Sequence, residues 1–488
     1  MNVNHLVSGL PFIKATRVCV DKEFKSIQQD SRHICLGDIY LAIVGSILDG
    51  HDYIRAAIKS GASGILLSDR VLFETLSSEF KDIHFVLYQA GKGHLVLASA
   101  AELTYDFPAH KLRLIGVTGT NGKTTTATII NYLLRSQKEK TALIGTIAYD
   151  LDGEVTVASH TTPDPLQLQQ IFTRCLSLGI TTVVMEISSH SADQQRFGSA
   201  KFESLIFTNL TGEHLDYHLN MENYFEAKRS LFVNSLASGG LSIINGDDKW
   251  GQRLLKEFPL QKAYGFQENI SNFSTTSTGS SFSLGKELVE TMLFGEFNAA
   301  NITAAILACE KHGLSLDDCV RSIAVFGGVS GRMQSVKLDN GATAFVDYAH
   351  TDDALYNVGR TLEKLPHGKI ITVFGCGGDR DRIKRSRMAK AVEHFSDLII
   401  VTADNTRNES LQQIFNDISD GFECKDKPLF VACRREAIEK AVALSCPTDL
   451  ILVAGKGHED YQIIGNKTTH FSDFEILSQY SKKNQHCF

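Results

Sequence analysis

Residues 112–128, LRLIGVTGTNGKTTTAT, decide how the central part of the chain folds. The apolar start of this segment predicts a buried strand, its glycine-rich middle predicts a turn, and its end predicts a helix. Three glycines, Gly116, Gly119 and Gly122, would let the backbone approach a polyphosphate closely. Because the N–H groups at the start of a helix also supply positive potential, the segment predicts a phosphate-binding loop.

Two residues next to the glycines strengthen this prediction. Lys123 adds a mobile ammonium, and Thr124 supplies a hydroxyl suited to magnesium. The strict pattern G-x-x-x-x-G-K-[ST] requires a glycine five positions before Gly122, where this chain has Val117, so the loop is a variant. An ordinary strand-to-helix turn is the alternative, but it gives no reason for Gly-Lys-Thr-Thr directly after an apolar strand.

The overall composition indicates a multidomain enzyme. At 488 residues the chain exceeds one compact core, and about 150 residues per domain suggests roughly three domains. The formal net charge of −7 and the lack of a dense basic tract argue against a nucleic-acid partner. Ten cysteines without CxxC or His–Cys spacing suit reduced thiols better than disulfides or a zinc site.

The hydropathy pattern bears on localisation. The N-terminus lacks a basic start followed by a long apolar run, and no later stretch reaches about 18 uninterrupted apolar residues. We therefore expect a soluble, cytoplasmic protein without membrane insertion, and we expect it to act as a monomer.

Alternating apolar strands and helical stretches predict an α/β fold of three domains. Residues 1–106 form a small α/β domain, in which residues 27–69 alternate short β-branched runs with one helix and glycine turns. Residues 107–326 carry the phosphate loop and the rhythm of a mostly parallel sheet. Residues 327–488 contain IITVFG, LIIVTADN and DLILVAGKG, which predict a second, Rossmann-like doubly wound sheet without a phosphate loop.

Polar residues in the second domain follow predicted strands, at the edge where parallel sheets bind ligands. Glu186 ends one strand and could hold magnesium, although a solvated strand end is the alternative. His214, Asp216 and His218 follow another strand, and one of them would reach a metal unless the histidines are structural. By composition alone, Lys228 is an ordinary solvated lysine on a helix.

Further candidates lie on both sides of these strands. Asn298 and Asn301 stand one helical turn apart, and their amides could read an adenine edge or cap the helix. Composition alone favours simple turn formers for Asp30, Ser31, Arg32, Gly45, Ser46, Asp49, Gly50 and His51.

Charged and polar residues of the third domain gather at three successive strand ends. They are Asp379, Arg380 and Asp381, then Asp404, Asn405 and Arg407, then Lys456, His458 and Glu459. Because carboxyl ends of parallel strands meet at one edge, this gathering favours a binding crevice over a decorated surface.

Taken together, the motifs resemble those of the Mur ligase family of peptidoglycan synthesis over nearly the whole chain. The family's variant loop, GxxGTNGKT, matches residues 116–124, where the strict pattern failed. TTPDP, EISSH followed by Gln194 and Arg196, HLDYH and YFEAKRSLF match in order and spacing. DSR followed by GDIYLAIVGSILDGHDYI resembles the family's uridine-nucleotide segment. The resemblance implies a three-domain, ATP-dependent ligase acting on small molecules.

The resemblance also assigns residues to each ligand. For the UDP-muramoyl substrate it implies Ser31, Ser46, His51, Thr161, Thr162, Ser188, Gln194 and Arg196. For ATP it implies Gly119, Thr120, Asn121, Gly122, Lys123, Thr124, Thr125, Asn301, Arg332, Asp347 and His350. For the incoming amino acid, meso-2,6-diaminopimelate, it implies Arg380, Asp404, Asn405, Arg407, Gly455 and Glu459.

Magnesium and catalysis follow from the same resemblance. Lys228 falls on the family's carbamylated lysine (N6-carboxylysine), and carbamylation replaces a cation with a carboxylate that can hold Mg²⁺. The implied metal ligands are Thr124, Glu186, His214 and the carbamate of Lys228. The implied catalytic residues are Lys123, Lys228, His214 and Arg332.

The implied reaction joins diaminopimelate to the D-glutamate carboxylate of UDP-N-acetylmuramoyl-L-alanyl-D-glutamate, with ATP forming an acyl phosphate. A folylpolyglutamate synthetase is the rival enzyme, although it would not need the nucleotide-sugar segments of the first domain. A non-catalytic ATP-binding regulator with a degenerate site is the rival from another class. Retention of Lys123, Thr124, Glu186, His214 and Lys228 together argues against it.

Two positions depart from the family pattern. Thr406 replaces the proline of the usual DNPR motif, and Asp352 replaces the proline usual after HT. The first departure puts the rigidity of the acceptor loop in question. The Thr406 departure does not affect the charge that Arg407 supplies. Family members that use lysine lack the arginine corresponding to Arg407.

Overall fold

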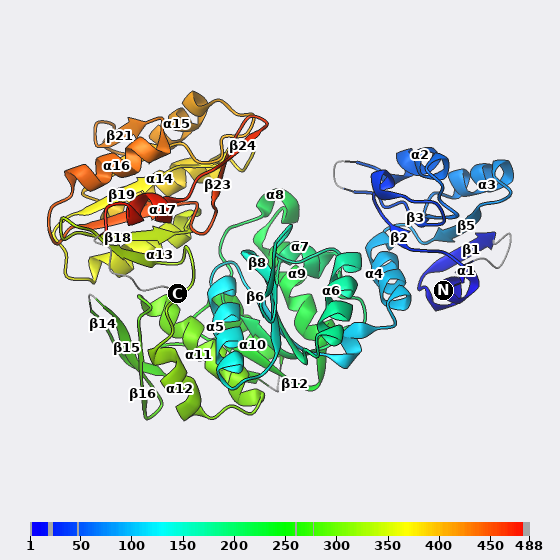
Figure 1. The fold of residues 1–488 in the computed structure, drawn as a ribbon, viewed down its shortest axis with the longest axis horizontal. Helices are drawn as coiled ribbons and strands as arrows, with labels where there is room; N and C mark the ends of the chain where they lie inside the picture. Colours follow the sequence, from blue (N-terminus) through cyan, green and yellow to red (C-terminus); the bar gives the residue numbers. More distant parts are fainter. Residues whose placement is uncertain (1, 18–22, 46–47, 259–260, 277, 482–488) are drawn as a thin grey trace. The chain divides into compact units, whose positions relative to one another are not determined.

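The computed structural model describes residues 2–17, 23–45, 48–258, 261–276 and 278–481, which Figure 1 draws as a ribbon. Contacts group the chain into two compact units. The first unit comprises Met1–Gly119, Gln137–Phe207 and Glu222–Ser242, and the second comprises Thr120–Ser136, Thr208–Met221 and Ile243–Phe488. Within the described residues, no helix combines the length and the apolar character needed to cross a membrane.

The N-terminal part folds around a five-stranded sheet, parallel except for its edge strand β1. In spatial order its strands are β1 (Ile13–Arg17), β5 (His84–Tyr88), β4 (Gly64–Leu67), β3 (Ile39–Leu41) and β2 (Ile27–Gln28). Its helices are α1 (Val3–Gly9), α2 (Ile54–Lys59), α3 (Arg70–Glu79) and α4 (Gly93–Thr104).

Both faces of this sheet are buried because successive side chains of each strand point to opposite sides. Leu66 and Val86 pack with α1 and α4 in one core, whereas Ile65 and Leu67 pack with α2 and α3 in the other. This arrangement has the small α/β fold predicted from the sequence, and α2 is the one α-helix among the described residues of 27–69.

An eight-stranded mixed sheet forms the middle of the chain, with four adjoining parallel strands and two strands at one edge that pair in antiparallel fashion. In spatial order its strands are β13 (Gln261–Tyr264), β12 (Leu236–Asn245), β11 (Phe202–Phe207), β6 (Arg113–Thr118), β10 (Thr182–Ile187), β7 (Thr141–Ile144), β8 (Ala148–Leu151) and β9 (Glu154–Val157). The associated helices are α5 (Lys123–Ser136), α6 (Pro165–Ser177), α7 (Ser189–Asp193), α8 (Leu215–His218), α9 (Met221–Asn234), α10 (Lys249–Glu257), α11 (Glu296–Lys311) and α12 (Leu316–Ala324).

One glycine of the opening segment has a different role from the one predicted. Gly116 lies inside β6 rather than in the loop. A Cβ at this position would lie 2.5 Å from Ile187 Cδ1 and 2.8 Å from Leu205 Cδ2. Gly116 is therefore needed for packing between neighbouring strands, and the prediction that it helps to cradle a phosphate is wrong.

A separate antiparallel sheet follows, which the sequence analysis did not identify. Its strands are β14 (Ile270–Thr276), β15 (Gly279–Leu284) and β16 (Glu287–Thr291). Alternating burial in β15 places Phe282 and Leu284 on the covered face, while serines occupy the positions between. This polar alternation lacks the continuous apolar runs that revealed the parallel strands.

The C-terminal part contains a six-stranded sheet with one antiparallel edge strand, β17. In spatial order its strands are β17 (Gln334–Lys337), β18 (Thr343–Asp347), β22 (Leu450–Ala454), β19 (Ile370–Phe374), β20 (Leu398–Thr402) and β21 (Pro428–Val431). Its helices are α13 (Asp352–Glu363), α14 (Ile383–Phe395), α15 (Leu411–Ser419), α16 (Arg434–Leu444) and α17 (Asp473–Ser478). A hairpin of β23 (Tyr461–Ile464) and β24 (Lys467–His470) follows β22.

Helices cover both faces of this sheet, as the prediction of a doubly wound domain requires (Figure 1). Phe374 and Leu452 share a core with α13, α14 and α15, whereas Val373 and Val453 share a core with α16 and α17. The order β22-β19-β20 places the carboxyl ends of three parallel strands side by side. The three charged strand ends predicted from the sequence therefore meet at one edge.

Candidate active site

The phosphate loop is fixed by hydrogen bonds to Asn209, in the segment after β11. Thr120 N donates to Asn209 O at 2.9 Å, and Asn121 N donates to Asn209 Oδ1 at 2.8 Å. Lys123 Nζ donates to Thr120 O at 2.7 Å, so the ammonium lies over the loop. Thr124 and Thr125 are both buried at the start of α5. The loop therefore has a defined conformation into which a phosphate group can be received.

Asn301 packs directly against this loop. Gly122 has a φ of +86°, and a Cβ there would lie 2.5 Å from Asn301 Oδ1. The same oxygen accepts a hydrogen bond from Thr126 Oγ1 at 3.3 Å, and Asn301 Nδ2 donates to Asn298 Oδ1 at 3.1 Å. Because α11 begins at Glu296, neither asparagine is its N-cap, so the capping alternative is wrong. The role of Asn301 toward ATP stays a prediction.

Arg332 connects the phosphate loop to the C-terminal sheet. Its Nη2 donates to Thr124 Oγ1 at 3.2 Å, and its guanidinium carbon lies 4.5 Å from the centre of the Tyr348 ring. Asp347, at the end of β18, accepts hydrogen bonds from Met333 N and Ala349 N, both at 2.7 Å. Burial raises the pKa of Asp347, although Arg332 opposes this effect. These contacts hold Arg332 at the loop that would receive the phosphates.

Two predicted site histidines flank one carboxylate, Glu213. His350 Nε2 lies 3.4 Å from Glu213 Oε1, and His214 Nε2 lies 3.7 Å from Glu213 Oε2. Burial disfavours the charged form of Glu213, but His350, His214 and Lys123 outweigh it and hold its pKa well below the usual range. His214 itself has a φ of +55°, a left-handed conformation that non-glycine residues seldom adopt.

Lys228 is buried rather than solvated, so the interpretation as an ordinary surface lysine is wrong. Lys228 is 1% exposed, and its Nζ donates to Gly119 O at 2.9 Å and to Thr118 Oγ1 at 3.4 Å. The ammonium also lies 4.9 Å from the centre of the Tyr224 ring. Burial of a lysine at the start of the phosphate loop is costly without a function or strong partners, which makes this residue a site candidate.

Glu186 is also buried, at 1% exposure, so the solvated strand-end alternative is wrong. Its carboxylate accepts hydrogen bonds from Thr146 N at 2.8 Å and Thr146 Oγ1 at 3.1 Å. A Cβ at Gly145 would lie 2.3 Å from Glu186 Oε1, so only glycine leaves room for the carboxylate there. Among the described residues, no three His, Cys, Asp or Glu side chains gather as a metal site.

Five residues implied for the muramyl-peptide substrate share one polar network. Thr162 is its centre, because its Oγ1 donates to Glu186 O at 2.9 Å and accepts from Ser188 N at 3.0 Å. Arg196 Nη1 donates to Thr162 O at 2.7 Å, and Arg196 Nε donates to Gln194 Oε1 at 3.0 Å. Thr161 joins through its hydroxyl, 3.1 Å from that of Thr146. The structure therefore brings these residues together, next to Glu186.

The three residues implied for the uridine group have different outcomes. His51 is buried and has partners for both ring nitrogens: Nε2 accepts from Ser68 N at 3.0 Å, and Nδ1 donates to Asp49 at 2.6 Å. Ser31 begins a short 3-10 helix that Asp30 caps. Ser46 lies outside the described residues. Roles of these residues in uridine binding stay predictions.

The residues implied for the amino acid meet at the carboxyl edge of the C-terminal sheet. Asn405 Nδ2 donates to Glu459 Oε2 at 2.9 Å, while Asn405 Oδ1 accepts from Lys456 Nζ at 3.1 Å. Lys456 is fully buried and also lies 3.7 Å from Asp404 Oδ1. Burial raises the pKa of Glu459. A Cβ at Gly455 would lie 2.8 Å from Asp404 Oδ2.

Arg407 stands beside this group with its charge uncompensated. Its Nη1 donates to two backbone carbonyls, Gly378 O at 2.9 Å and Asn405 O at 3.3 Å. Within the part of the chain that the structure describes, no carboxylate lies within 4.0 Å of its guanidinium. Arg380 is exposed on the neighbouring loop, and its Nη1 donates to Asp379 O at 3.4 Å. Both arginines are therefore available for a substrate carboxylate.

Of two residues that organise these sites, sequence reasoning missed one and gave the other no role of its own. Thr146 fixes the Glu186 carboxylate, but a threonine after a strand carries no distinctive signal. Lys456 was identified only as one charge at a strand end, although its spacing of three residues before Glu459 could have indicated a buried ion pair. Its burial is a property of the folded sheet edge and cannot be read from composition.

Comparison with known families supports this description of the fold. The Mur ligase middle domain matches residues 117–309, and the Mur ligase glutamate ligase domain matches residues 331–457. A folylpolyglutamate synthase from Mycobacterium tuberculosis, solved with ADP and AMPPCP, has a TM-score of 0.62 at 17% identity. That comparison covers 74% of this chain and 92% of the synthase, and it shows similarity of fold alone.

Two relatives cover nearly the whole chain. The UDP-N-acetylmuramoyl-L-alanyl-D-glutamate--2,6-diaminopimelate ligase of Clostridium tetani is 40% identical over 474 residues, 94% of this chain and 95% of the relative. A solved structure of a ligase with the same name has a TM-score of 0.65 and 30% identity, covering 95% of this chain and 96% of that one. The chain therefore belongs to the Mur ligase family, with the three-domain α/β architecture of that family.

Proposed function

We propose that this protein is the ATP-dependent ligase that joins meso-2,6-diaminopimelate to UDP-N-acetylmuramoyl-L-alanyl-D-glutamate in the cytoplasm. The observation that carries the proposal is the pairing of opposite charges at the acceptor edge. The carboxylates of Glu459 and Asp404 both accept hydrogen bonds from Asn405, and the uncompensated guanidinium of Arg407 lies against the Asn405 carbonyl. An amino acid whose far end carries both an ammonium and a carboxylate fits this arrangement.

The charges at this edge discriminate between acceptors. Buried Lys456 lies near both carboxylates, 3.7 Å from Asp404 Oδ1 and 3.5 Å from Glu459 Oε2, and its single positive charge leaves a net negative charge for a substrate ammonium. Burial alone would raise the pKa of Asp404, but Lys456 and Arg434 outweigh burial and hold the pKa below its usual value. Lysine would leave Arg407 without a partner, and glutamate would leave the carboxylates without one, so both should be poor acceptors.

The proposed chemistry begins with transfer of the ATP γ-phosphoryl group to the D-glutamate carboxylate. Lys123 lies over the phosphate loop and Arg332 bonds Thr124, so both can neutralise charge on the transferring group. The acceptor amine then attacks the acyl phosphate carbon, and phosphate leaves after a tetrahedral intermediate. The reaction requires no nucleophile from the protein.

We propose that Mg²⁺ is held by Thr124, Glu186, His214 and a carbamate on Lys228. The oxygen-rich donor set suits this hard cation, and the space kept by Gly145 accommodates the Glu186 carboxylate. A carbamylated Lys228 retains one N–H, so it could keep the hydrogen bond to Gly119 O. When bound, magnesium would neutralise phosphate charge and polarise the transferring group.

We further propose that residues 1–106, 107–326 and 327–488 are the domains for the UDP-muramoyl substrate, ATP and the amino acid. The separate sheets of these three segments support this division. The protein would act as a monomer on small-molecule substrates.

One assay tests the function. The purified protein is given ATP, Mg²⁺ and the UDP-muramoyl dipeptide, and phosphate release is compared with diaminopimelate, lysine and glutamate as acceptors. We expect release that depends on both the dipeptide and diaminopimelate. Release with a folate and glutamate instead would support the folylpolyglutamate alternative, and release without any acceptor dependence would contradict both ligase assignments.

A further inference from the structure

A fully buried arginine, Arg385, ties together the two loops that carry Arg380 and Arg407. It lies in the first turn of α14, and its side chain is 0% exposed. Its Nη1 donates to Glu409 Oε1 at 2.8 Å, and its Nη2 donates to Glu409 Oε2 at 2.6 Å and to Gly377 O at 3.1 Å. One guanidinium therefore holds a carboxylate of the loop after β20 and a carbonyl of the loop after β19.

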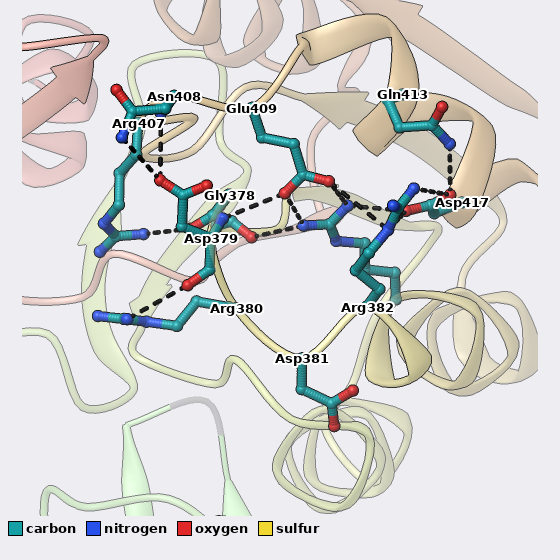
Figure 2. A network of polar contacts seen from close by, with 12 residues as sticks. Gly378, Asp379, Arg380, Asp381, Arg382, Arg407, Asn408, Glu409, Gln413 and Asp417 are labelled. Atoms are coloured by element: carbon teal, nitrogen blue, oxygen red, sulfur yellow. Dashed lines mark hydrogen bonds and ion pairs between the residues drawn. The ribbon is translucent and has the colours of Figure 1, made fainter. Parts of the chain in front are cut away.

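Glu409 extends this connection to the turn that precedes Arg380 (Figure 2). Its Oε2 also accepts a hydrogen bond from Asp379 N at 3.1 Å. Asp379 has a φ of +54°, and its Oδ2 accepts from Asn408 Nδ2 at 3.1 Å. The strained backbone of Asp379 is therefore held between two residues that follow Arg407 in the chain.

The Arg407 guanidinium rests on the same turn. A Cβ at Gly378 would lie 1.9 Å from Thr406 O, which shows that the two loops touch through their backbones. Gly378 N donates to Asn405 O at 2.9 Å, and Gly378 O accepts from Arg407 Nη1 at 2.9 Å. A Cβ at Gly377 would lie 3.1 Å from that same nitrogen. Any shift of the glycine turn would therefore move the Arg407 guanidinium.

The carboxylates of Glu409 and Asp417 are compensated without Arg407. Asp417 accepts hydrogen bonds from Arg385 Nη1 at 2.7 Å and from Arg382 Nε at 3.0 Å. Two guanidinium groups thus compensate the carboxylates of Glu409 and Asp417, and the contacts with Arg385 and Arg382 lower the pKa of both carboxyls. The cluster consequently supports Arg407 through geometry and does not compete for its charge.

We propose that Arg385 is a positioning residue for acceptor choice. By holding Gly377 O and Glu409 together, it fixes the turn on which the Arg407 guanidinium lies, and thereby sets the place of the distal carboxylate of the amino acid. This inference rests on the proposed function, because it concerns the acceptor site of the same reaction.

The test compares Arg385→Lys with Arg382→Lys in the full-length enzyme. Lysine keeps the buried charge but cannot bond both Glu409 oxygens and Gly377 O at once. We expect Arg385→Lys to raise the KM for diaminopimelate by about tenfold to a hundredfold, the loss typical of charge-assisted hydrogen bonds. The kcat/KM preference for diaminopimelate over lysine should fall by a similar factor, while the KM for ATP stays within about twofold.

Arg382→Lys is the matched control, because Arg382 contacts the same carboxylates from a side chain that is 55% exposed. It should leave the preference within about twofold of wild type. If Arg385→Lys does not fold, Glu409→Gln takes its place, with the same expected fall in preference.

Three results would overturn the inference. A folded Arg385→Lys enzyme, or its Glu409→Gln substitute, that keeps the wild-type preference would overturn the positioning role alone. An equal loss of kcat with both acceptors would do the same, because it indicates general disruption. A wild-type enzyme that does not use diaminopimelate would overturn the proposed function and this inference together.

Discussion

Arg407→Ala should weaken the binding of diaminopimelate and leave the other steps of the reaction nearly unchanged. Among the described residues the guanidinium donates hydrogen bonds only to carbonyls, so its charge is available to the distal carboxylate of the substrate. Losing a charge-assisted bidentate contact of this kind costs about 2 to 5 kcal/mol, or roughly 30-fold to several-thousand-fold in binding. We expect the KM for diaminopimelate to rise by such a factor and the KM for ATP to stay nearly unchanged.

The substitution should leave the fold largely intact. Arg407 has a φ of +50°, and alanine bears about the same strain in this conformation, so the backbone term nearly cancels. The two lost hydrogen bonds to carbonyls predict a stability decrease of about 1 to 3 kcal/mol, measurable by denaturant unfolding.

Steady-state phosphate release with diaminopimelate and with lysine measures the effect of Arg407→Ala. Arg435→Ala is a suitable control, because Arg435 is 48% exposed on α16 and lies 3.9 Å from Glu439. If Arg407→Ala kept the wild-type preference for diaminopimelate, or if the wild type used lysine equally well, the acceptor assignment would be wrong.

Four other changes test separate parts of the structure. Lys123→Ala should lower kcat at saturating ATP by about a thousandfold or more, since the loop glycines cannot replace a charge on the transferring phosphoryl group; near wild-type turnover would refute this role. Lys228→Ala should lose activity that short-chain carboxylic acids partly restore, and an intact mass showing an unmodified lysine in active enzyme would contradict the carbamate. Thr406→Pro should raise stability by about 0.4 to 1 kcal/mol in denaturant unfolding; a decrease would show that this position does not accept proline's φ. Burial, and to a lesser extent the charge of Arg332, lowers the pKa of His458 from 6.5 to about 4. As the pH falls, the unfolded chain therefore takes up the proton before the folded protein does. The free energy of unfolding should fall by about 3 kcal/mol between about pH 6.5 and pH 4. His458→Gln should flatten this slope in pH-dependent unfolding, and an unchanged slope would assign it to other groups.

The parallel sheets could be predicted from the sequence because their strands are buried on both faces. Strands β19, β20 and β22 are continuous apolar runs that end in polar turns, and each formed where its run indicated. Strands β14 to β16 could not be found this way, because one face is polar and serine alternates with apolar residues. Gly116 shows the related difficulty that a glycine needed for packing looks like a glycine needed for a ligand.

Candidate site residues could be named from the sequence where they belong to a motif. They could not be named where their role depends on burial in the folded protein. Composition favoured a solvated surface role for Lys228 and left one open as the alternative for Glu186, and only the fold shows that both are 1% exposed. The family resemblance singled both out as metal ligands, a role that stays a prediction, but it did not reveal Thr146 or Arg385. Those two side chains act on their neighbours through hydrogen bonds that form only when distant segments pack together.

The two departures from the family pattern occur where other interactions can replace a proline. Asp352 occupies the first position of α13, after the N-cap Thr351, where an acidic side chain favours the helix dipole much as proline favours the backbone angle. At the other departure, Thr406 O accepts from Glu409 N at 3.1 Å, and Arg407 is held on both sides by Ile463 O and Gly465 N. Among the described residues, Thr406 N has no hydrogen-bond acceptor, so a proline there would remove none. The rigidity of the acceptor loop therefore comes from its hydrogen bonds to β23 and to the glycine turn, and the loss of proline need not relax the choice of amino acid.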